Sequence, residues 1–176
     1  MQPDLNKPKA PAFLKNVSPV PSMDPAALSK LTDDLAERAS LDGLLRCSRL
    51  LAEFRPQLRP GVYYSEAHAE ILRAILELHD RGAVVDALTV CTELRRRDVL
   101  DTIGGRQFVE GLAGTVQEPD HARPHLEHVI ALSAARDLCF EARRIVAEGM
   151  RTKEHPYAFI ERSVREVARI VTRADD

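Results

Sequence analysis

Three histidines with neighbouring carboxylates have the residue types and spacing that come nearest to a metal site. His121, His125 and His128 fall within eight residues, and His125 and His128 could share one face of a helix. A zinc site of a familiar kind would also show a Cys ligand pair or an H-E-x-x-H pattern, and the sequence has neither. Pro124 separates His121 from the other two histidines. The pattern favours a polar helix start, and we expect no metal and no cofactor.

Two further stretches could bind phosphate groups. The run Arg95 to Arg97 could face DNA if it lay in a helix-turn-helix. Three consecutive residues, however, point over most of a helix circumference, and cations in a last turn stabilise the helix dipole. Gly104 and Gly105 lack the lysine of a Walker A loop, because no lysine occurs between Lys30 and Lys153. The sequence therefore indicates a solvated helix end and shows no machinery for binding and hydrolysing ATP.

Nucleophilic catalysis is not indicated. No serine lies in a G-x-S-x-G pattern, and Cys47, Cys91 and Cys139 lie in apolar helical patterns, where a thiolate is disfavoured. We expect reduced core cysteines in a cytoplasmic protein. The net charge of −2 gives no global attraction to nucleic acid. No apolar run approaches the roughly 20 residues that span a membrane, and no secretory signal is visible.

A stripe of arginines near the C-terminus is the last charged candidate. Arg162, Arg165, Arg169 and Arg173 recur at helical spacing. They could face an acidic or phosphate-bearing partner. Because glutamates are interleaved with them, a solvated helix face is the preferred interpretation.

The elements that must position all these residues are predicted to be helical. Six of the eleven prolines fall within the first 25 residues, so residues 1–23 are expected to be a disordered, proline-rich tail. Residues 24–119 are expected to form a small multi-helix globular head. A helix is predicted from about Ser65 to Arg81, followed by Gly82 as a left-handed cap. An earlier helical pattern runs until Pro56 through a set of apolar positions: Leu28, Leu31, Leu35, Leu41, Leu44, Leu45, Leu50, Leu51 and Phe54.

The stretch "VVDALTVCTELRRRDVLDTIGG", residues 84–105, opens like a strand but favours a helix. Asp86 is a good N-cap, and Val85 and Val90 have the spacing of a hydrophobic staple. The buried face is expected to contain Leu88, Cys91 and Leu94. A strand is the alternative. The paired glycines at its end allow a tight turn into a further short helix that carries Phe108, Val109 and Leu112.

Residues 120–176 are expected to form a long antiparallel helical hairpin. One helix is predicted from about Pro124 to Gly149 and a second from about Pro156 to Ala174, with a short link between them. Apolar residues of the first helix point in more than one direction, so one neighbour could not cover them. Another subunit could, and the expected interface residues are Leu132, Phe140, Ile160, Val164, Val167 and Val171.

The order of these elements resembles the N-terminal domain of the DnaB-type replicative DNA helicases. The stretches "LAERASLDGLL", "VYYSEAHAEILRAILELHDRG" and "VVDALTVCTELRRRDVLDTIGGRQFVEGLAG" carry the resemblance, and the long helix "HLEHVIALSAARDLCFEARRIVAEG" follows them. The matching structural motif positions include His68, Asp86, Thr89, Gly104, Gly105 and Phe108. Two departures are "VQEPDHARP", where the family usually has P-S-x-x-N, and Asp42, where it has a glycine.

The resemblance implies a non-catalytic collar of a replicative helicase. In the family such domains pair through hairpins and heads into rings, from dimers to hexamers, and offer surfaces to primase and helicase loaders. A stand-alone version could also join a host helicase, and contact with DNA would be indirect. The ATPase motor of a full 5′–3′ helicase is expected to lie outside these residues. A DNA-binding regulator that uses Arg95 to Arg97 or the Arg162 stripe is the competing hypothesis.

Overall fold

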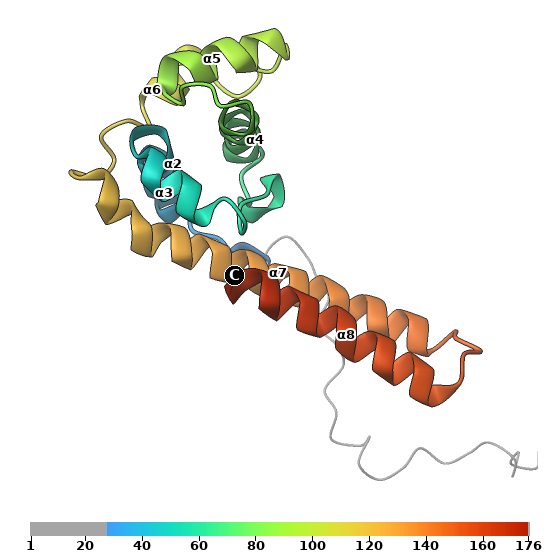
Figure 1. Cartoon of the computed structure of the whole chain (residues 1–176). Helices are drawn as coiled ribbons and strands as arrows, with labels where there is room; N and C mark the ends of the chain where they lie inside the picture. The colour runs from blue at the N-terminus through green and yellow to red at the C-terminus, as the bar shows by residue number, and fades with distance from the viewer. Residues whose placement is uncertain (1–27, 176) are drawn as a thin grey trace, which may run out of the picture.

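The structure, a computed structural model, describes residues 28–175, and these form α-helices and short 3-10 turns without a strand (Figure 1). The elements in chain order are η2 (Ser29–Leu31), α2 (Asp34–Arg46), α3 (Ser48–Phe54), η3 (Pro60–Val62), α4 (Glu66–Asp80), α5 (Ala87–Arg96), α6 (Gly105–Glu110), η4 (Pro119–Ala122), α7 (Arg123–Gly149) and α8 (Pro156–Asp175). The expected all-α class, a small head followed by a long antiparallel hairpin, is confirmed. The expected tail, residues 1–23, lies outside the described residues.

The apolar pattern before Pro56 is divided among several elements instead of one helix. Asp33 begins α2 by accepting a hydrogen bond of 3.0 Å from the Ala36 N–H. Cys47 begins α3 in the same way, with its Sγ 3.4 Å from the Leu50 nitrogen. Each new start resets the helical register, so Leu35 is exposed in the first turn of α2. The expected helical pattern through Leu28, Leu31 and Leu35 is therefore interrupted between η2 and α2.

Local capping defines α4 and α5 at the residues that the sequence indicates. The backbone of Gly82 after α4 has φ 67°, the left-handed region in which glycine is favoured. Asp86 and Thr89 form a capping box, in which each side chain accepts a hydrogen bond from the other residue's N–H. Residues 87–96 are therefore a helix, and the strand alternative is wrong. Leu88 is exposed, contrary to expectation, because α5 packs on α4 through the face that carries Val90, Cys91 and Leu94, and Leu88 points away from it.

The core lies between α2, α3, α4 and the first half of α7, and α5 and α6 add buried side chains to it. Its largest fully buried side chains include Leu41, Leu44, Leu50, Leu51, Ile71, Leu72, Ile75, Leu94, Leu112 and Leu126. Gly43 allows α2 to approach η4, because a Cβ at this position would overlap the Cβ of Ala122. This close approach fixes the point at which α7 begins.

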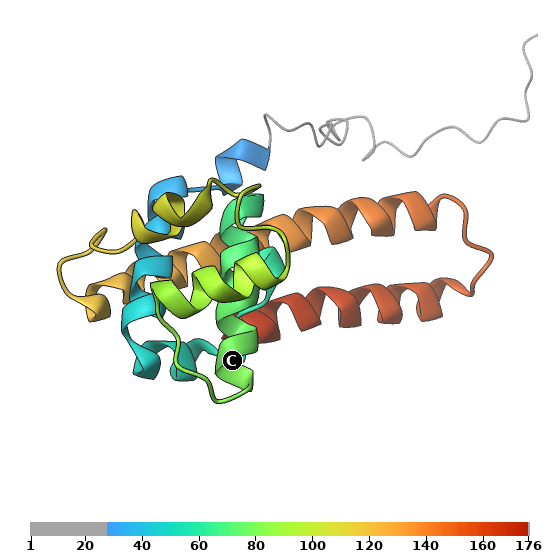
Figure 2. The ribbon, with the colours of Figure 1, turned by 90° about the horizontal axis from the view of Figure 1, so that it is seen from above.

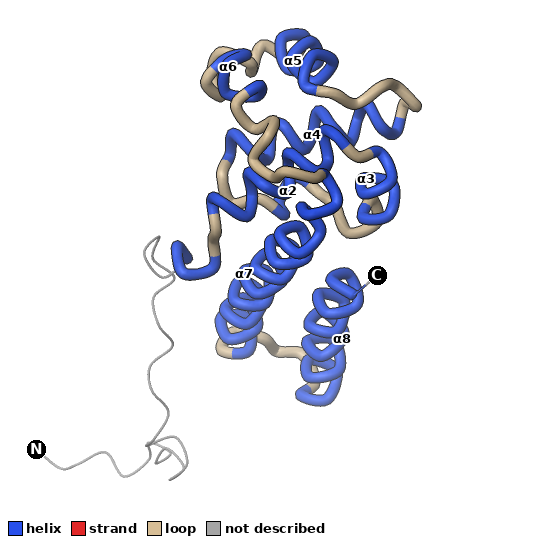
Figure 3. The backbone as a smooth tube through the Cα atoms, turned by 90° about the vertical axis from the view of Figure 1, so that its left-hand side faces the viewer, coloured by secondary structure: helices blue, strands red, loops and turns tan. Residues whose placement is uncertain are grey.

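The hairpin starts under the head and then projects beyond it. The first half of α7 packs against α2, and its second half runs side by side with the antiparallel α8 (Figures 1 and 2). α7 contains 27 residues, so it is about 40 Å long at about 1.5 Å per residue. Viewed almost along the hairpin, α7 and α8 leave the head together, and α8 ends close to it (Figure 3). Within residues 28–175, no helix combines the length and apolar character that crossing a bilayer would require.

Candidate functional site

The hairpin has one exposed apolar face that no part of residues 28–175 covers. On α8, Ile160, Val164 and Val171 are exposed, Val164 by 62% of its surface. Their spacing places them on one side of the helix, about a quarter turn from Ser163 and Ile170, which are buried. The sequence pattern of α8 thus contains two stripes, of which the buried one packs inside the chain and the other faces solvent.

α7 contributes one more side chain to this face. Asp137, Glu141 and Glu148 mark the side of α7 that faces α8, through the ion pairs around them. At about 100° per residue, the exposed Leu138 points to the same side of the hairpin as the exposed valines of α8, whereas the exposed Val146 points to the back of α7. We call Leu138, Ile160, Val164 and Val171 the apolar face.

The predicted interface residues divide into three groups. Ile160, Val164 and Val171 belong to the apolar face, while Leu132 and Val167 are half-buried. Phe140 is exposed but lies on the other side of the hairpin, in a groove of about 590 Å³ whose lining includes Arg144 and Arg169. The sequence gives no reference direction for the apolar residues of α7. It could therefore not separate Phe140 from the others, and it missed Leu138 for the same reason.

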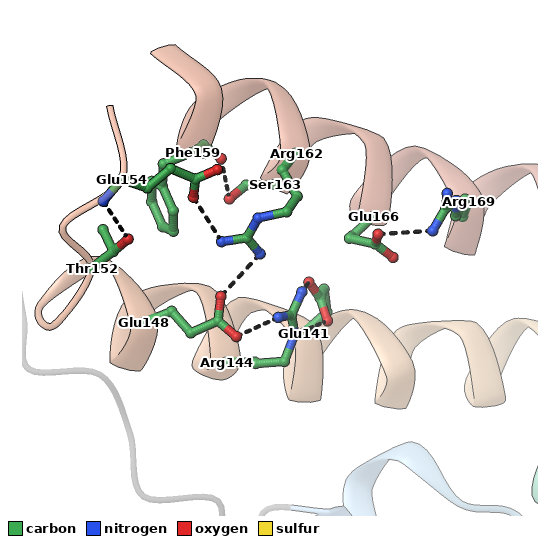
Figure 4. A network of polar contacts seen from close by, with 10 residues as sticks. All are labelled: Glu141, Arg144, Glu148, Thr152, Glu154, Phe159, Arg162, Ser163, Glu166 and Arg169. Atoms are coloured by element: carbon green, nitrogen blue, oxygen red, sulfur yellow. Dashed lines mark hydrogen bonds and ion pairs between the residues drawn. The ribbon is translucent and has the colours of Figure 1, made fainter. Parts of the chain in front are cut away.

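Ion pairs join the two helices near the far end of the hairpin (Figure 4). Arg162 of α8 reaches Glu148 of α7 at 3.0 Å and Glu154 of the connecting turn at 3.2 Å. Arg144 binds Glu148 from the α7 side and also Glu141, each at 2.5 Å. Hydrogen bonds that Arg144 donates to Glu141 and Glu148 raise the pKa of its guanidinium above the usual value. Of these residues, Arg162 connects α8 to α7, whereas the pairs of Arg144 lie within α7.

The arginine stripe of α8 is matched by carboxylates. Besides Arg162, Arg165 pairs with Glu161 at 3.6 Å and Arg169 with Glu166 at 2.8 Å. Arg173 lies 3.3 Å from Asp137 of α7. The stripe therefore corresponds to the solvated, charge-balanced face that the sequence favoured.

A polar seam holds the hairpin against the head. Asp137 accepts hydrogen bonds from Arg59 of the loop before η3 and from Arg173 of α8. Arg136, buried beside it, donates to the carbonyl oxygens of Leu31 and Val62, each at 2.6 Å. Burial lowers the pKa of the Arg136 guanidinium. One turn of α7 thus fixes η2, η3 and the end of α8 together.

His68, one of the predicted motif residues, lies in a buried polar cluster of the head. Its Nδ1 is 2.8 Å from Oε2 of Glu37, and its ring stacks on Phe108 with centroids 5.8 Å apart. The Glu37 carboxylate also accepts the backbone N–H groups of Tyr64 and Ser65, at 2.6 and 3.3 Å. The cluster therefore ties α2, the start of α4 and α6 into one unit, and its role is structural.

The glycine pair and the capping box act locally. Gly104 and Gly105 have φ of 107° and 74°. This turn begins α6 and places the Phe108 ring against His68. Asp86 and Thr89 define the start of α5 as described. None of these four residues faces a cavity of catalytic character in the described chain, so they are elements of the scaffold.

Two residues of the arginine run at the end of α5, Arg96 and Arg97, are held by internal carboxylates. Glu93, buried, accepts hydrogen bonds from Arg96 at 2.6 Å, Arg81 at 2.8 Å and Arg97 at 3.1 Å. Arg97 also pairs with Glu77 of α4. The bonds from Arg96 and Arg81 hold the pKa of the Glu93 carboxyl well below its usual range. Arg96 and Arg97 consequently connect α5 to α4, and the structure favours this role over phosphate binding.

The remaining chemical candidates are dispersed. His121 lies in η4, whereas His125 and His128 lie on α7, where His128 is 3.5 Å from Asp33. In the described part of the chain, no three His, Cys, Asp or Glu side chains are arranged to hold a metal ion. Cys91 is buried as expected, but Cys47 is half-buried and Cys139 is exposed on α7, so the expectation of three core cysteines is wrong for these two.

Head, seam and apolar face together define an all-α module in which a compact head carries a projecting hairpin with an uncovered apolar side. A family model described as the DnaB-like helicase N terminal domain matches residues 30–131, more than half of the chain. The chain belongs to this family.

Individual relatives agree with this assignment. The replicative DNA helicase DnaB of Mycobacterium leprae is 35% identical over 142 residues, which cover 81% of this chain and 22% of that protein. The DnaB of Treponema pallidum is 31% identical over 132 residues, covering 75% of this chain and 30% of that protein. The chain therefore spans less than a third of either relative.

Solved structures show the same fold. The crystal structure of the N-terminal domain of DnaB helicase from Mycobacterium tuberculosis superposes with a TM-score of 0.67 at 32% identity, covering 78% of this chain and 96% of that one. A DnaB-like replicative helicase, solved in a study of its interactions with primase, gives a TM-score of 0.65 at 22% identity, covering 78% of this chain and 31% of that one. The second likeness bears on the fold alone.

Proposed function

We propose that this chain is a collar module of a replicative DNA helicase, which joins copies through the hairpin and offers a docking surface to protein partners. The apolar face carries the proposal. Four exposed aliphatic side chains lie on one side of a projecting hairpin, and exposed apolar patches mark protein interfaces. Membership of the DnaB-like family supports the assignment to DNA replication.

Assembly of copies is the first part of the proposal. A second hairpin can cover the apolar face with the same residues, as in an isologous dimer. Fully burying one valine, leucine or isoleucine contributes about 1.5–3 kcal/mol. Because the four side chains of the apolar face are about half exposed, each contributes about half of that, and two copies together gain an amount comparable with the loss of freedom on association. Dimers are the simplest state, and larger rings require contacts of the head as well.

Partner docking is the second part. The solved DnaB-like helicase described with its interactions with primase supports primase as the partner class. A helicase loader is the alternative partner. Motor activity would belong to segments other than these residues, since they match the N-terminal domain of the family.

Light scattering coupled to size exclusion tests the assembly. The wild-type chain should elute as a dimer or larger at tens of micromolar, and Val164→Asp should be a monomer with unchanged helical content. Ala147→Asp is the matched control, because Ala147 is exposed on α7 on the other side of the hairpin. A monomeric wild-type chain, or equal behaviour of the two variants, would contradict the proposal.

The competing DNA-binding regulator receives less support. Its two proposed surfaces, the run at the end of α5 and the arginine stripe of α8, are largely matched by carboxylates of the same chain. Tight duplex binding lost on neutralising Arg165 and Arg169 would favour it.

A further inference from the structure

The turn at the far end of the hairpin differs in charge from the rest of it. Residues 143–157 contain four Arg or Lys and two Glu, in a chain whose net charge is −2. The two carboxylates, Glu148 and Glu154, are both bound by Arg162. Arg151 and Lys153 are exposed and have no carboxylate within 4 Å among residues 28–175. The turn therefore presents uncompensated positive charge.

Aromatic rings lie directly beside these cations. The rings of His155 and Tyr157 stack, with centroids 5.8 Å apart and planes inclined by 23°. Tyr157 is 78% exposed, so a large part of its ring surface is open to solvent. Stacking on His155 restrains the Tyr157 ring, and a restrained ring loses less freedom when a ligand stacks on it. Nothing in the head or hairpin described so far requires this pair.

The turn itself is ordered by its own hydrogen bonds. The Thr152 N–H donates to the Glu148 carbonyl oxygen at 2.8 Å, and the Glu154 N–H donates to Thr152 Oγ1 at 3.1 Å. Arg162 anchors Glu154 from α8, as Figure 4 shows. The cations and the rings consequently project from a preorganised turn.

We infer that this turn, Arg151 to Tyr157, is a contact site for single-stranded nucleic acid. Single strands are bound by the combination found here, in which cations meet backbone phosphates and an exposed ring receives a base. A duplex does not fit, because its bases are already stacked and one turn offers neither a helix nor a ribbon for a groove. A lipid surface fits less well, because a shallow turn with the single tyrosine ring and Met150 lacks a continuous apolar side to insert.

The site is separate from the proposed assembly. Arg151 and Lys153 lie outside the apolar face, and their positions follow from the turn and not from a second copy. Each copy in an assembly would carry one such turn, so a multimer would bind a strand more tightly than a monomer by linkage of sites. The test therefore includes the Val164→Asp variant, which separates loss of assembly from loss of the site.

Fluorescence anisotropy with a labelled oligothymidylate of about 20 nucleotides, long enough to cover one site of this kind, tests the inference. Binding is expected at low salt, with log affinity falling against log salt by about 0.7 for each phosphate contact. The double variant Arg151→Gln/Lys153→Gln should reduce affinity about tenfold or more and lower the slope by about 1.4, the loss of two contacts. Tyr157→Leu should reduce affinity about tenfold at an unchanged slope.

Arg165→Gln is the matched control, because Arg165 is exposed on α8, about 12 Å along the helix from Tyr157, and pairs with Glu161. It should bind like the wild type. No binding of the wild type at low salt would overturn the inference, as would equal affinity for a duplex or preference for anionic vesicles or an acidic peptide. Equal losses for the control and the double variant would overturn it too. A Val164→Asp chain that binds a strand weakly with the same mutational pattern would uphold the site while leaving assembly as a separate result.

Discussion

The carboxylate of Glu37 provides the sharpest test of how the head is held together. It is 2% exposed and accepts three hydrogen bonds, from the N–H groups of Tyr64 and Ser65 and from His68. Replacement by alanine removes the acceptor and leaves these donors inside the protein without a partner. Replacement by glutamine keeps the volume and one acceptor oxygen but removes the charge.

The expected loss of stability follows from the number of donors left behind. Each buried donor without a partner costs about 1–3 kcal/mol. The Ser65 contact is long and can be given up cheaply, so two strong donors remain, and Glu37→Ala should destabilise the chain by about 3–5 kcal/mol, the range for breaking a buried polar pair. At about 2–4 °C for each kcal/mol in a chain of this size, the melting temperature should fall by roughly 6–20 °C. Glu37→Gln should have about half the effect.

Urea unfolding followed by circular dichroism measures both variants, with thermal melting as a second readout. Glu161→Ala is the control, because Glu161 is exposed and its ion pair with Arg165 is long at 3.6 Å. Its effect should stay within about 0.5 kcal/mol. If Glu37→Ala were no more destabilising than Glu161→Ala, the assignment of Glu37 as the central acceptor of the head would be refuted.

Three further predictions concern other joints of the fold. Gly43→Ala should destabilise by about 1–3 kcal/mol because its Cβ overlaps that of Ala122; adding Ala122→Gly should restore part of the loss in urea unfolding, and no recovery would count against the close approach. Asp86→Ala removes the N-cap of α5 and should cost about 1 kcal/mol, whereas Asp101→Ala, at an exposed position in the turn after the helix, should cost less. The depressed pKa of Glu93 means that its ionised form stabilises the fold above the ordinary value near 4.5, and this contribution is lost as pH falls through the folded-state pKa. Melting temperature measured from pH 6 downward should therefore fall less steeply in Glu93→Gln than in the wild type, and parallel curves would show that Glu93 is not responsible.

Features set by a few neighbouring residues could be read from the sequence. Ser65, Asp86 and Gly82 lie at helix ends because their side chains or φ angles satisfy local backbone needs, and each has the predicted role. The long helices of the hairpin begin and end within a residue of their predicted limits, since Pro124 and Pro156 mark their first turns. These signals do not depend on tertiary packing.

Features set by distant residues could not be read in this way. Glu37 and His68 are separated by 31 positions, and Arg136 and Leu31 by 105, so no local pattern announces either contact. Polar side chains at such positions resemble solvated residues until their partners are known. Leu88 shows the converse, because an apolar residue at a helical position can face solvent when its helix packs through one side only.

The direction of faces was the main unknown of the hairpin. Periodicity shows that α8 has apolar residues on a stripe, but only the position of α7 shows that Ile170 points inward and Val164 outward. The same reference separates Phe140 from Leu138, which the sequence alone treats alike. The residue pattern gives the angles between side chains around one helix. The position of a neighbouring helix is needed to know which of these side chains are buried and which are exposed.

The seam at Asp137 has a geometric consequence. Because Arg173 is tied to the same carboxylate as Arg59, the backbone goes out along α7 and comes back to its starting region. The hairpin therefore returns to the place where it leaves the head. Adding the same number of helical turns to α7 and to α8 would move the connecting turn farther out and leave Arg173 in place. The length of the hairpin and the position at which α8 ends are thus independent, and evolution could change one without the other.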